Sequence, residues 1–169
     1  MNPELEPRDS GLRGPAWAVV DLDAVARNYR FLRNRVGPGR ALYAVVKADA
    51  YGHGGERVAR RLALEGADRF AVAHTEEGVS LRRAGVRGEI LLLSHAEPGD
   101  LPRQRAYGLT PTLYDQVQAE ALAREARRLR EPLPVHLELD TGMGRAGIRP
   151  EALDSVARLL AQSPWLRLE

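Results

Sequence analysis

The stretch that decides the fold is Ala41-Leu42-Tyr43-Ala44-Val45-Val46-Lys47-Ala48-Asp49-Ala50-Tyr51-Gly52-His53-Gly54. Its first part is nearly all apolar, which is typical of a strand buried on both faces of a parallel sheet. The sequence therefore predicts a strand over residues 41–46, followed by a glycine-rich turn over residues 48–54. Lys47 stands where the strand ends, and we expect it to face a cleft rather than open solvent.

Lys47 is the only lysine among the 25 lysines and arginines of the chain. Arginine supplies structural cations but stays protonated, whereas a lysine amine can lose its proton and attack a carbonyl group. The ordinary alternative is a solvated surface charge in an arginine-rich protein. The position of Lys47 at the end of a buried strand favours a lysine that takes part in chemistry.

The composition is typical of one globular domain, with 169 residues, 44% hydrophobic and 28% charged. Because the chain has no cysteine, disulfides and thiolate metal sites are excluded, which fits the cytoplasmic location that we expect. The formal net charge is +2 and arginines alternate with glutamates, so nucleic acid is not an expected partner. Residues 1–16 resemble a polar leader rather than a signal peptide. No apolar run approaches the roughly 18 residues that span a membrane, so we expect no membrane association.

Strand patterns alternate with helix patterns along the rest of the chain. Strands are predicted over 17–22, 41–46, 69–73, 89–94, 109–113 and 134–140, with a further strand beginning within 164–169. Helices are predicted over 23–36, 55–65, 75–84, 98–106, 114–131 and 151–162, the first capped by Asp23. This alternation predicts an α/β fold with a parallel sheet and right-handed crossovers. Periodicity leaves two architectures open, a doubly wound sheet and a closed eight-stranded barrel. A barrel typically takes about 250 residues, so on that interpretation the chain covers only part of one.

A second motif, His136-Leu137-Glu138-Leu139-Asp140-Thr141-Gly142-Met143-Gly144-Arg145-Ala146-Gly147, contains the spacing G-x-G-x-x-G. This spacing suggests a dinucleotide site, but such a turn must itself open a helix, and Pro150 places the helix start later. The alternative is a tight turn that brings Arg145 to the same cleft as Lys47. A guanidinium there suits a substrate carboxylate, which predicts an amino acid or keto acid as ligand. The ordinary reading is an ion pair of Arg145 with Glu138 or Asp140.

Together these two motifs resemble the alanine racemases, and the resemblance extends from about Trp17 to Glu169. It implies an incomplete (β/α)8 TIM-like barrel of about five βα units, and the interconversion of L-alanine and D-alanine for cell-wall peptidoglycan. By the resemblance, Lys47 binds pyridoxal 5'-phosphate as an aldimine and acts as acid and base. Tyr51 contacts the cofactor phosphate, and Arg145 contacts the cofactor's phenolic oxygen and the substrate carboxylate.

The resemblance also implies a domain organisation. Residues 23–169 would be the partial barrel, with strand six beginning at Glu169. Residues 17–22 would be a strand that joins a C-terminal β domain absent from this chain. The base opposing Lys47 would be a tyrosine of that domain in the partner subunit of a homodimer. We therefore expect a truncated chain that is inactive alone.

Glu138 departs from the pattern of many family members, which carry a carbamylated lysine seven residues before the substrate arginine. Because glutamate supplies a permanent carboxylate, the hypothesis is that Glu138 orients Arg145 directly by a charge-assisted hydrogen bond.

Three other functions stay open at this stage. They are a non-catalytic pyridoxal phosphate-binding barrel, a nucleotide-binding domain that uses residues 142–147, and a related barrel decarboxylase. A metal site is not expected, because His74, His95 and His136 are widely spaced and lack further ligands at a characteristic spacing.

Overall fold

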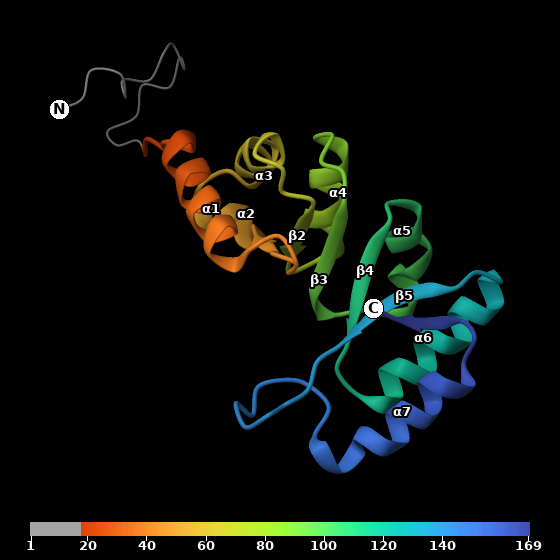
Figure 1. The fold of residues 1–169 in the computed structure, drawn as a ribbon. Helices are drawn as coiled ribbons and strands as arrows, with labels where there is room; N and C mark the ends of the chain where they lie inside the picture. The colour runs from red at the N-terminus through yellow and green to blue at the C-terminus, as the bar shows by residue number, and fades with distance from the viewer. Residues whose placement is uncertain (1–17) are drawn as a thin grey trace.

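The computed structural model describes residues 18–169 (Figure 1). Its strands are β1 (Ala44–Val45), β2 (Arg69–Val72), β3 (Glu89–His95), β4 (Leu109–Leu113), β5 (Leu133–Leu137) and β6 (Leu166–Leu168). Its α-helices are α1 (Leu22–Val36), α2 (Lys47–Gly52), α3 (Gly55–Leu64), α4 (Thr75–Arg83), α5 (Leu101–Ala106), α6 (Gln116–Leu129) and α7 (Leu153–Gln162). Short 3₁₀ turns, Pro98–Asp100 and Pro150–Ala152, precede α5 and α7. The predicted alternation of strands and helices is thus present.

The predicted strand over 17–22 is absent from residues 18–21, which carry no regular secondary structure, and residue 17 lies outside the described residues. Leu22 already belongs to α1. The cap of α1 is Asp21 rather than Asp23, because its Oδ1 accepts the N–H groups of Asp23 and Ala24 at 2.9 Å each. An aspartate that caps a helix in this way needs extended backbone, which is why its surroundings look like a strand in the sequence.

The strand order decides between the two architectures. Within residues 18–169 one six-stranded sheet has the order β1-β2-β3-β4-β5-β6, and every neighbouring pair is parallel. A doubly wound sheet must reverse its order part way, so that helices cover both faces. Here the order never reverses, and right-handed crossovers then place every helix on the same face. The chain therefore forms part of a (β/α)8-type barrel, with its helices along the outer side of a curved sheet (Figure 1).

Two strands differ from their predicted bounds in ways that bear on the site. β1 is only two residues long, because the backbone before Ala44 and after Val45 leaves the ladder with β2. β6 is formed as Leu166–Leu168 and pairs with β5, inside the range 164–169 where the strand pattern predicts a strand to begin, whereas the family resemblance placed its start only at Glu169.

The buried core consists of two clusters. The first lies around Phe70, Val72 and Ile90 and joins the early strands to α1, α3 and α4. The second lies around Leu113, Leu122 and Val135 and joins the later strands to α6 and α7. Burial of these side chains fixes the helices against the outer face of the sheet.

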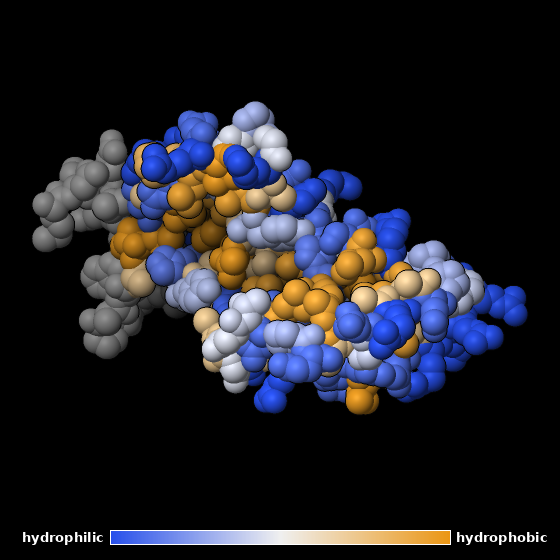
Figure 2. Space-filling view, turned by 60° about the horizontal axis from the view of Figure 1, so that its bottom comes forward, coloured by the Kyte–Doolittle hydropathy of each residue, from blue (hydrophilic) through white to orange (hydrophobic). Residues whose placement is uncertain are grey.

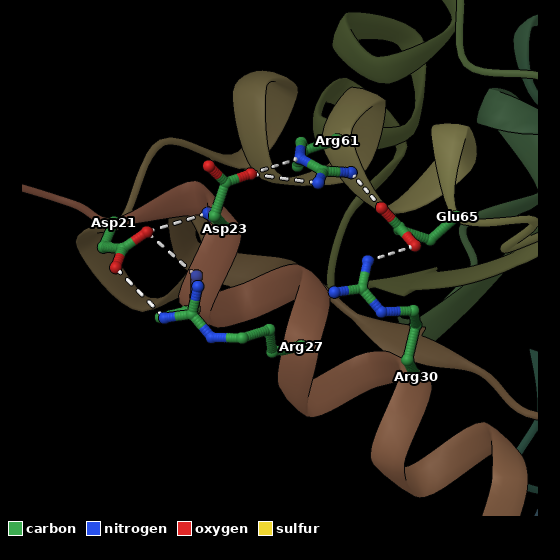
Figure 3. A network of polar contacts seen from close by, with 7 residues as sticks. Asp21, Asp23, Arg27, Arg30, Arg61 and Glu65 are labelled. Carbon is green, nitrogen blue, oxygen red and sulfur yellow. Dashed lines mark hydrogen bonds and ion pairs between the residues drawn. The ribbon is translucent and has the colours of Figure 1, made fainter.

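An ionic network joins α1 to α3 (Figure 3). The Glu65 carboxylate accepts hydrogen bonds from Arg30 at 2.6 Å and from Arg61 at 2.5 Å, and Arg61 also reaches Asp23 at 3.0 Å. These charges hold the exposed side of α1 beside α3.

The inner side of the sheet is not closed by a strand pairing between β1 and β6 in the described part of the chain. Figure 2 shows hydrophobic residues gathered in a hollow across the middle of the molecule, with hydrophilic residues along its margins. Val45 on β1 and Leu168 on β6 are 43% and 53% exposed.

Among the described helices, none is long and apolar enough to cross a membrane.

Candidate active site

Lys47 comes directly after the first strand of the sheet. The N–H of buried Val46 still donates to the carbonyl oxygen of Ala71 at 2.9 Å, and Lys47 is the next residue. Its side chain is partly buried, and it makes no hydrogen bond or ion pair with any residue in 18–169. An amine that no structural carboxylate neutralises is available for reaction with a carbonyl group.

The turn after Lys47 is left-handed over four residues that are not glycine. Residues 48–51 have φ between 51° and 55° and ψ between 40° and 49°. Left-handed backbone costs L residues about 1–2 kcal/mol each and normally occurs at single positions. Sequence reasoning predicts a glycine-rich turn here but misses this run, because Gly52 and Gly54 come only after it. Strain of this kind persists only where the surrounding structure imposes it.

Hydrogen bonds within the turn impose part of that conformation. The Asp49 carboxylate accepts the N–H of Gly55 at 2.6 Å, and the Asp49 carbonyl oxygen accepts the N–H of Gly54 at 2.9 Å. The His53 ring nitrogen Nδ1 lies 2.9 Å from the carbonyl oxygen of Ala50, to which it donates. His53 therefore helps to hold the conformation of the turn. The sequence analysis assigned no chemical role to His53.

Tyr51 is the last residue of the left-handed run and is 61% exposed. Its hydroxyl makes no hydrogen bond within residues 18–169. The turn thus presents an amine and a hydroxyl, four residues apart, that are both free to meet a ligand.

The second predicted motif forms a closed loop after β5. β5 ends at Leu137 rather than at the predicted residue 140, and the chain then pairs with itself. Asp140 donates its N–H to the carbonyl oxygen of Ile148 at 3.0 Å, and Ile148 donates to that of Glu138 at 2.8 Å. Gly147 has φ +116°, and a Cβ there would lie 2.8 Å from the Asp140 nitrogen. Only glycine fits this closure without strain.

Asp140 also shapes the loop that carries Arg145. Its Oδ1 accepts the N–H groups of Gly144 at 2.9 Å and Gly142 at 3.0 Å, and these bonds hold the pKa of the Asp140 carboxyl below its usual value. Arg145 follows directly, is exposed, and has no hydrogen-bond or ion-pair partner in the described residues. Helical structure begins only at Pro150, so this glycine-rich turn does not open a helix and lacks the geometry of a dinucleotide site.

Glu138 and Arg145 are not joined by a hydrogen bond or an ion pair in the part of the chain that the structure describes, so the direct orientation of Arg145 by Glu138 stays a prediction. Both side chains act on Tyr114, which sequence reasoning missed. Burial raises the pKa of Tyr114, the negative charge of Glu138 raises it further, and the positive charge of Arg145 opposes the rise. The Tyr114 hydroxyl donates to the carbonyl oxygen of Leu93 at 2.7 Å. No sequence pattern pointed to Tyr114, which follows β4 without a motif.

The topology places the two motifs at one edge of the sheet. Lys47 follows β1 and the Arg145 loop follows β5, and the carboxyl ends of parallel strands all meet at the same edge. In barrels of this type the active site lies at that edge. The fold therefore places Lys47, Tyr51 and the loop of Arg145 at one edge of the sheet, and their roles there stay predictions.

A polar cluster lies across the strands and was not predicted. The Tyr43 hydroxyl donates to the Glu89 carboxylate at 2.5 Å, and the same carboxylate oxygen lies 3.2 Å from Nε2 of His136. Burial raises the pKa of the Tyr43 hydroxyl, and the hydrogen bond to Glu89 adds to this. The cluster links the start of β1 to β3 and β5, and makes His136 the satisfied polar group that a strand histidine usually is. No group of three or more metal-binding side chains occurs among the described residues.

Comparisons with known proteins agree with this geometry. Residues 20–169 match the family model described as "Alanine racemase, N-terminal domain". The chain belongs to the alanine racemase N-terminal domain family. It is 44% identical over 159 residues to an alanine racemase of Symbiobacterium thermophilum, and 45% identical over 150 residues to one of Azoarcus. These matches cover 94% and 88% of this chain but 42% and 41% of the relatives, so the chain spans about two fifths of their length.

Solved alanine racemase structures share the fold. The Clostridium difficile alanine racemase superposes with a TM-score of 0.85 at 32% identity, covering 94% of this chain and 44% of that one. The Bacillus anthracis alanine racemase, solved with bound L-Ala-P, superposes with a TM-score of 0.79 at 33% identity, covering 89% and 39%. The barrel assignment from strand order and the family assignment from sequence thus support each other.

Proposed function

We propose that this chain forms the lysine-bearing part of a pyridoxal 5'-phosphate-dependent alanine racemase, which interconverts L-alanine and D-alanine. The observation that carries the proposal is the setting of Lys47. This sole lysine follows the first strand of a partial barrel, at the edge where barrels place their active sites, and no described residue neutralises it. The shared name of the relatives, alanine racemase, supports the reaction class.

The donors at this edge fit pyridoxal 5'-phosphate, which carries an aldehyde, a phosphate and a phenolic oxygen. Lys47 offers an amine, Tyr51 a free hydroxyl and Arg145 a free guanidinium. In the proposal Lys47 would hold the cofactor through its aldehyde, Tyr51 would bind the phosphate, and Arg145 would bind near the phenolic oxygen. When bound, this cofactor stabilises negative charge at the substrate Cα.

Racemisation removes the Cα proton from one face of the amino acid and returns one to the other face. Once the substrate amine has taken its place on the cofactor, the Lys47 amine would be free and would move the proton on one face. Arg145 would bind the substrate carboxylate and fix which face Lys47 meets. A second base must act on the opposite face. We assign that role to a tyrosine of a C-terminal domain in the partner subunit of a homodimer.

Glu138 is included in the proposal as the carboxylate that orients Arg145 once a substrate carboxylate is bound. A Glu138→Gln substitution should then weaken substrate binding more than cofactor binding. The product, D-alanine, would serve peptidoglycan synthesis in the cytoplasm.

The first experiment is reaction of the purified chain with pyridoxal 5'-phosphate, reduction with borohydride, and peptide mapping. One reduced adduct on Lys47 is expected, and the Lys47→Arg variant should carry none beyond modification of the N-terminal amine. Equal labelling of the N-terminus and Lys47, with no preference for the lysine, would count against a built cofactor site.

Racemisation itself is tested in a chimera that joins this chain to the remaining part of the Symbiobacterium thermophilum relative. The chimera should convert L-alanine to D-alanine, and Lys47→Arg should abolish conversion. A chimera that folds and binds the cofactor but does not racemise alanine would favour a non-catalytic cofactor-binding barrel instead.

A further inference from the structure

The left-handed run over residues 48–51 begins directly after Lys47, so its conformation sets the direction in which the lysine side chain leaves the strand. Within the turn, the Ala50 N–H donates to the Val46 carbonyl oxygen at 2.9 Å, and bonds of Asp49 and His53 close the far end. None of these bonds uses the N–H of Ala48, the residue next to the lysine. The partner of that N–H lies outside the turn.

The Glu77 carboxylate makes the contact at that end. Its Oε1 accepts the N–H of Ala48 at 2.6 Å. Its Oε2 accepts the N–H of Ala73 at 2.7 Å and that of His74 at 3.2 Å. One carboxylate near the start of α4 therefore connects the backbone after β1 to the backbone after β2. Hydrogen bonds that a carboxylate accepts are stronger than those between neutral groups.

Packing fixes only part of the turn, through Ala50, which is buried in the core. The turn also borders a cavity of about 340 Å³, which is lined by Val46 and Asp49 and by Glu76, Glu77 and Ser80 of α4. Ala48 itself is exposed. Without the Glu77 contact, a strained backbone would have both the free energy and the space to relax into this cavity.

We propose that Glu77 is a positioning residue for Lys47, which fixes the lysine's direction by holding the first N–H after it. The importance of that direction rests on the proposed function, whereas the contact and its effect on the turn do not. Glu76 provides a matched control. It is the preceding residue on α4, lines the same cavity, and among residues 18–169 pairs only with Arg103, at 2.7 Å.

The first test is amide hydrogen exchange, which needs no cofactor. In the unchanged chain the Ala48 amide should exchange slowly although its residue is exposed, because exchange requires the Glu77 bond to open. Exchange as fast as in an unprotected amide would overturn the proposal before any variant is made. In Glu77→Gln the amides of residues 48–54 should exchange at least about tenfold faster, while those of α6 follow the Glu76→Gln control. Equal exchange of residues 48–54 in the two variants would also overturn it.

The second test separates positioning from general destabilisation. Lys47 is alkylated reductively with formaldehyde, which needs no preset direction, and in parallel with pyridoxal 5'-phosphate. Glu77→Gln should lower the ratio of the rate with pyridoxal 5'-phosphate to the rate with formaldehyde by about tenfold. Glu76→Gln should leave this ratio unchanged. A purely structural role of Glu77 would change both rates together. If Lys47 of the unchanged chain reacts with pyridoxal 5'-phosphate no more readily than the N-terminal amine does, the proposed function fails. Hydrogen exchange then still decides the role of Glu77.

Discussion

Asp140 does for the arginine loop what Asp49 does for the lysine turn. In each case one carboxylate oxygen accepts glycine N–H groups further along the chain and closes a segment that carries a candidate active-site side chain. Both aspartates accept hydrogen bonds from the backbone, and Lys47 and Arg145 are left without structural partners among the described residues. In each segment, the aspartate holds the backbone conformation, while a different residue, Lys47 or Arg145, carries the candidate active-site side chain.

Removal of the Asp140 charge should change how the stability depends on pH. Because hydrogen bonds lower the pKa of Asp140 in the folded state, its stabilising effect is complete above the unfolded pKa of about 3.9 and is lost as the pH falls through the lower folded pKa. Asp140→Asn should therefore be less stable than the unchanged chain at about pH 7, and the difference should shrink at about pH 3. Urea unfolding at both pH values measures this. Asp154→Asn, an exposed change on α7, is the control, and a difference that grows on acidification would contradict the prediction.

Gly147→Ala should destabilise the loop, because the new Cβ would meet the Asp140 nitrogen at 2.8 Å with the backbone at φ +116°. A cost of roughly 1–3 kcal/mol is expected for an L residue forced into this conformation. Denaturant unfolding gives the value. Gly39→Ala, where nothing lies within 4 Å and φ is not positive, should change stability by less than about 1 kcal/mol. Similar costs at both sites would show that the loop closes in another way.

The sequence indicated which side chains are candidates for chemistry, but it did not indicate the backbone conformation that positions them. Lys47 was visible because it is the only lysine, and Arg145 because glycines surround it. The left-handed run was not visible, because Ala48 and Asp49 carry no sequence signal for positive φ. Glu77 and Tyr114 were missed for a related reason, since Glu77 lies on α4 and Tyr114 directly after β4, both far from the two motifs in the sequence.

At the level of elements, helices were predicted more closely than strands. α6 and α7 lie within one or two residues of their predicted ends, because an amphipathic period of many residues leaves little freedom. β1 and β5 are shorter than their apolar runs, because strand length depends on the partner strand as well as on the sequence. The cap of α1 was misplaced by two residues, because two aspartates, Asp21 and Asp23, both suit a cap.

The α1–α3 network offers a prediction at this scale. Arg30 and Arg61 hold the pKa of the Glu65 carboxyl below its usual value by hydrogen bonds to it. Glu65→Gln should lower the thermal midpoint slightly at low ionic strength and hardly at all in about 1 M salt, because ions screen charges at the surface. Differential scanning fluorimetry across a salt series measures the shift. Glu120→Gln on α6, whose Arg124 pair is 4.0 Å apart, is the control. A Glu65→Gln effect that persists in salt would mean that shape rather than charge holds the helices together.

At the level of the whole molecule, the sequence could not distinguish a barrel from a doubly wound sheet. Both arise from the same alternation of strands and helices, and neither local pattern nor composition records which strands become neighbours. The unreversed order from β1 to β6 decides it, and the same order leaves β1 and β6 with one neighbouring strand each among the described residues.

Open strand edges should make the purified chain associate. β6 carries the exposed Leu168 and has no second neighbouring strand among the described residues, and an unpaired strand edge is a template for pairing with another chain. Sedimentation velocity over a concentration series should show association, which Leu168→Lys should reduce several-fold. Leu64→Lys, an exposed change on α3 away from either edge, should leave it unchanged. Equal effects of the two substitutions would place the contact elsewhere.

The unreversed strand order also bears on how the protein is made. Each strand pairs with the one before it, so every new βα unit finds its partner already synthesised and never waits for a later one. Ribosomes add about 5–20 residues per second, far more slowly than loops close or helices form. The sheet can therefore grow strand by strand as the chain emerges, and the segment carrying Lys47 meets β2 within seconds of its own synthesis.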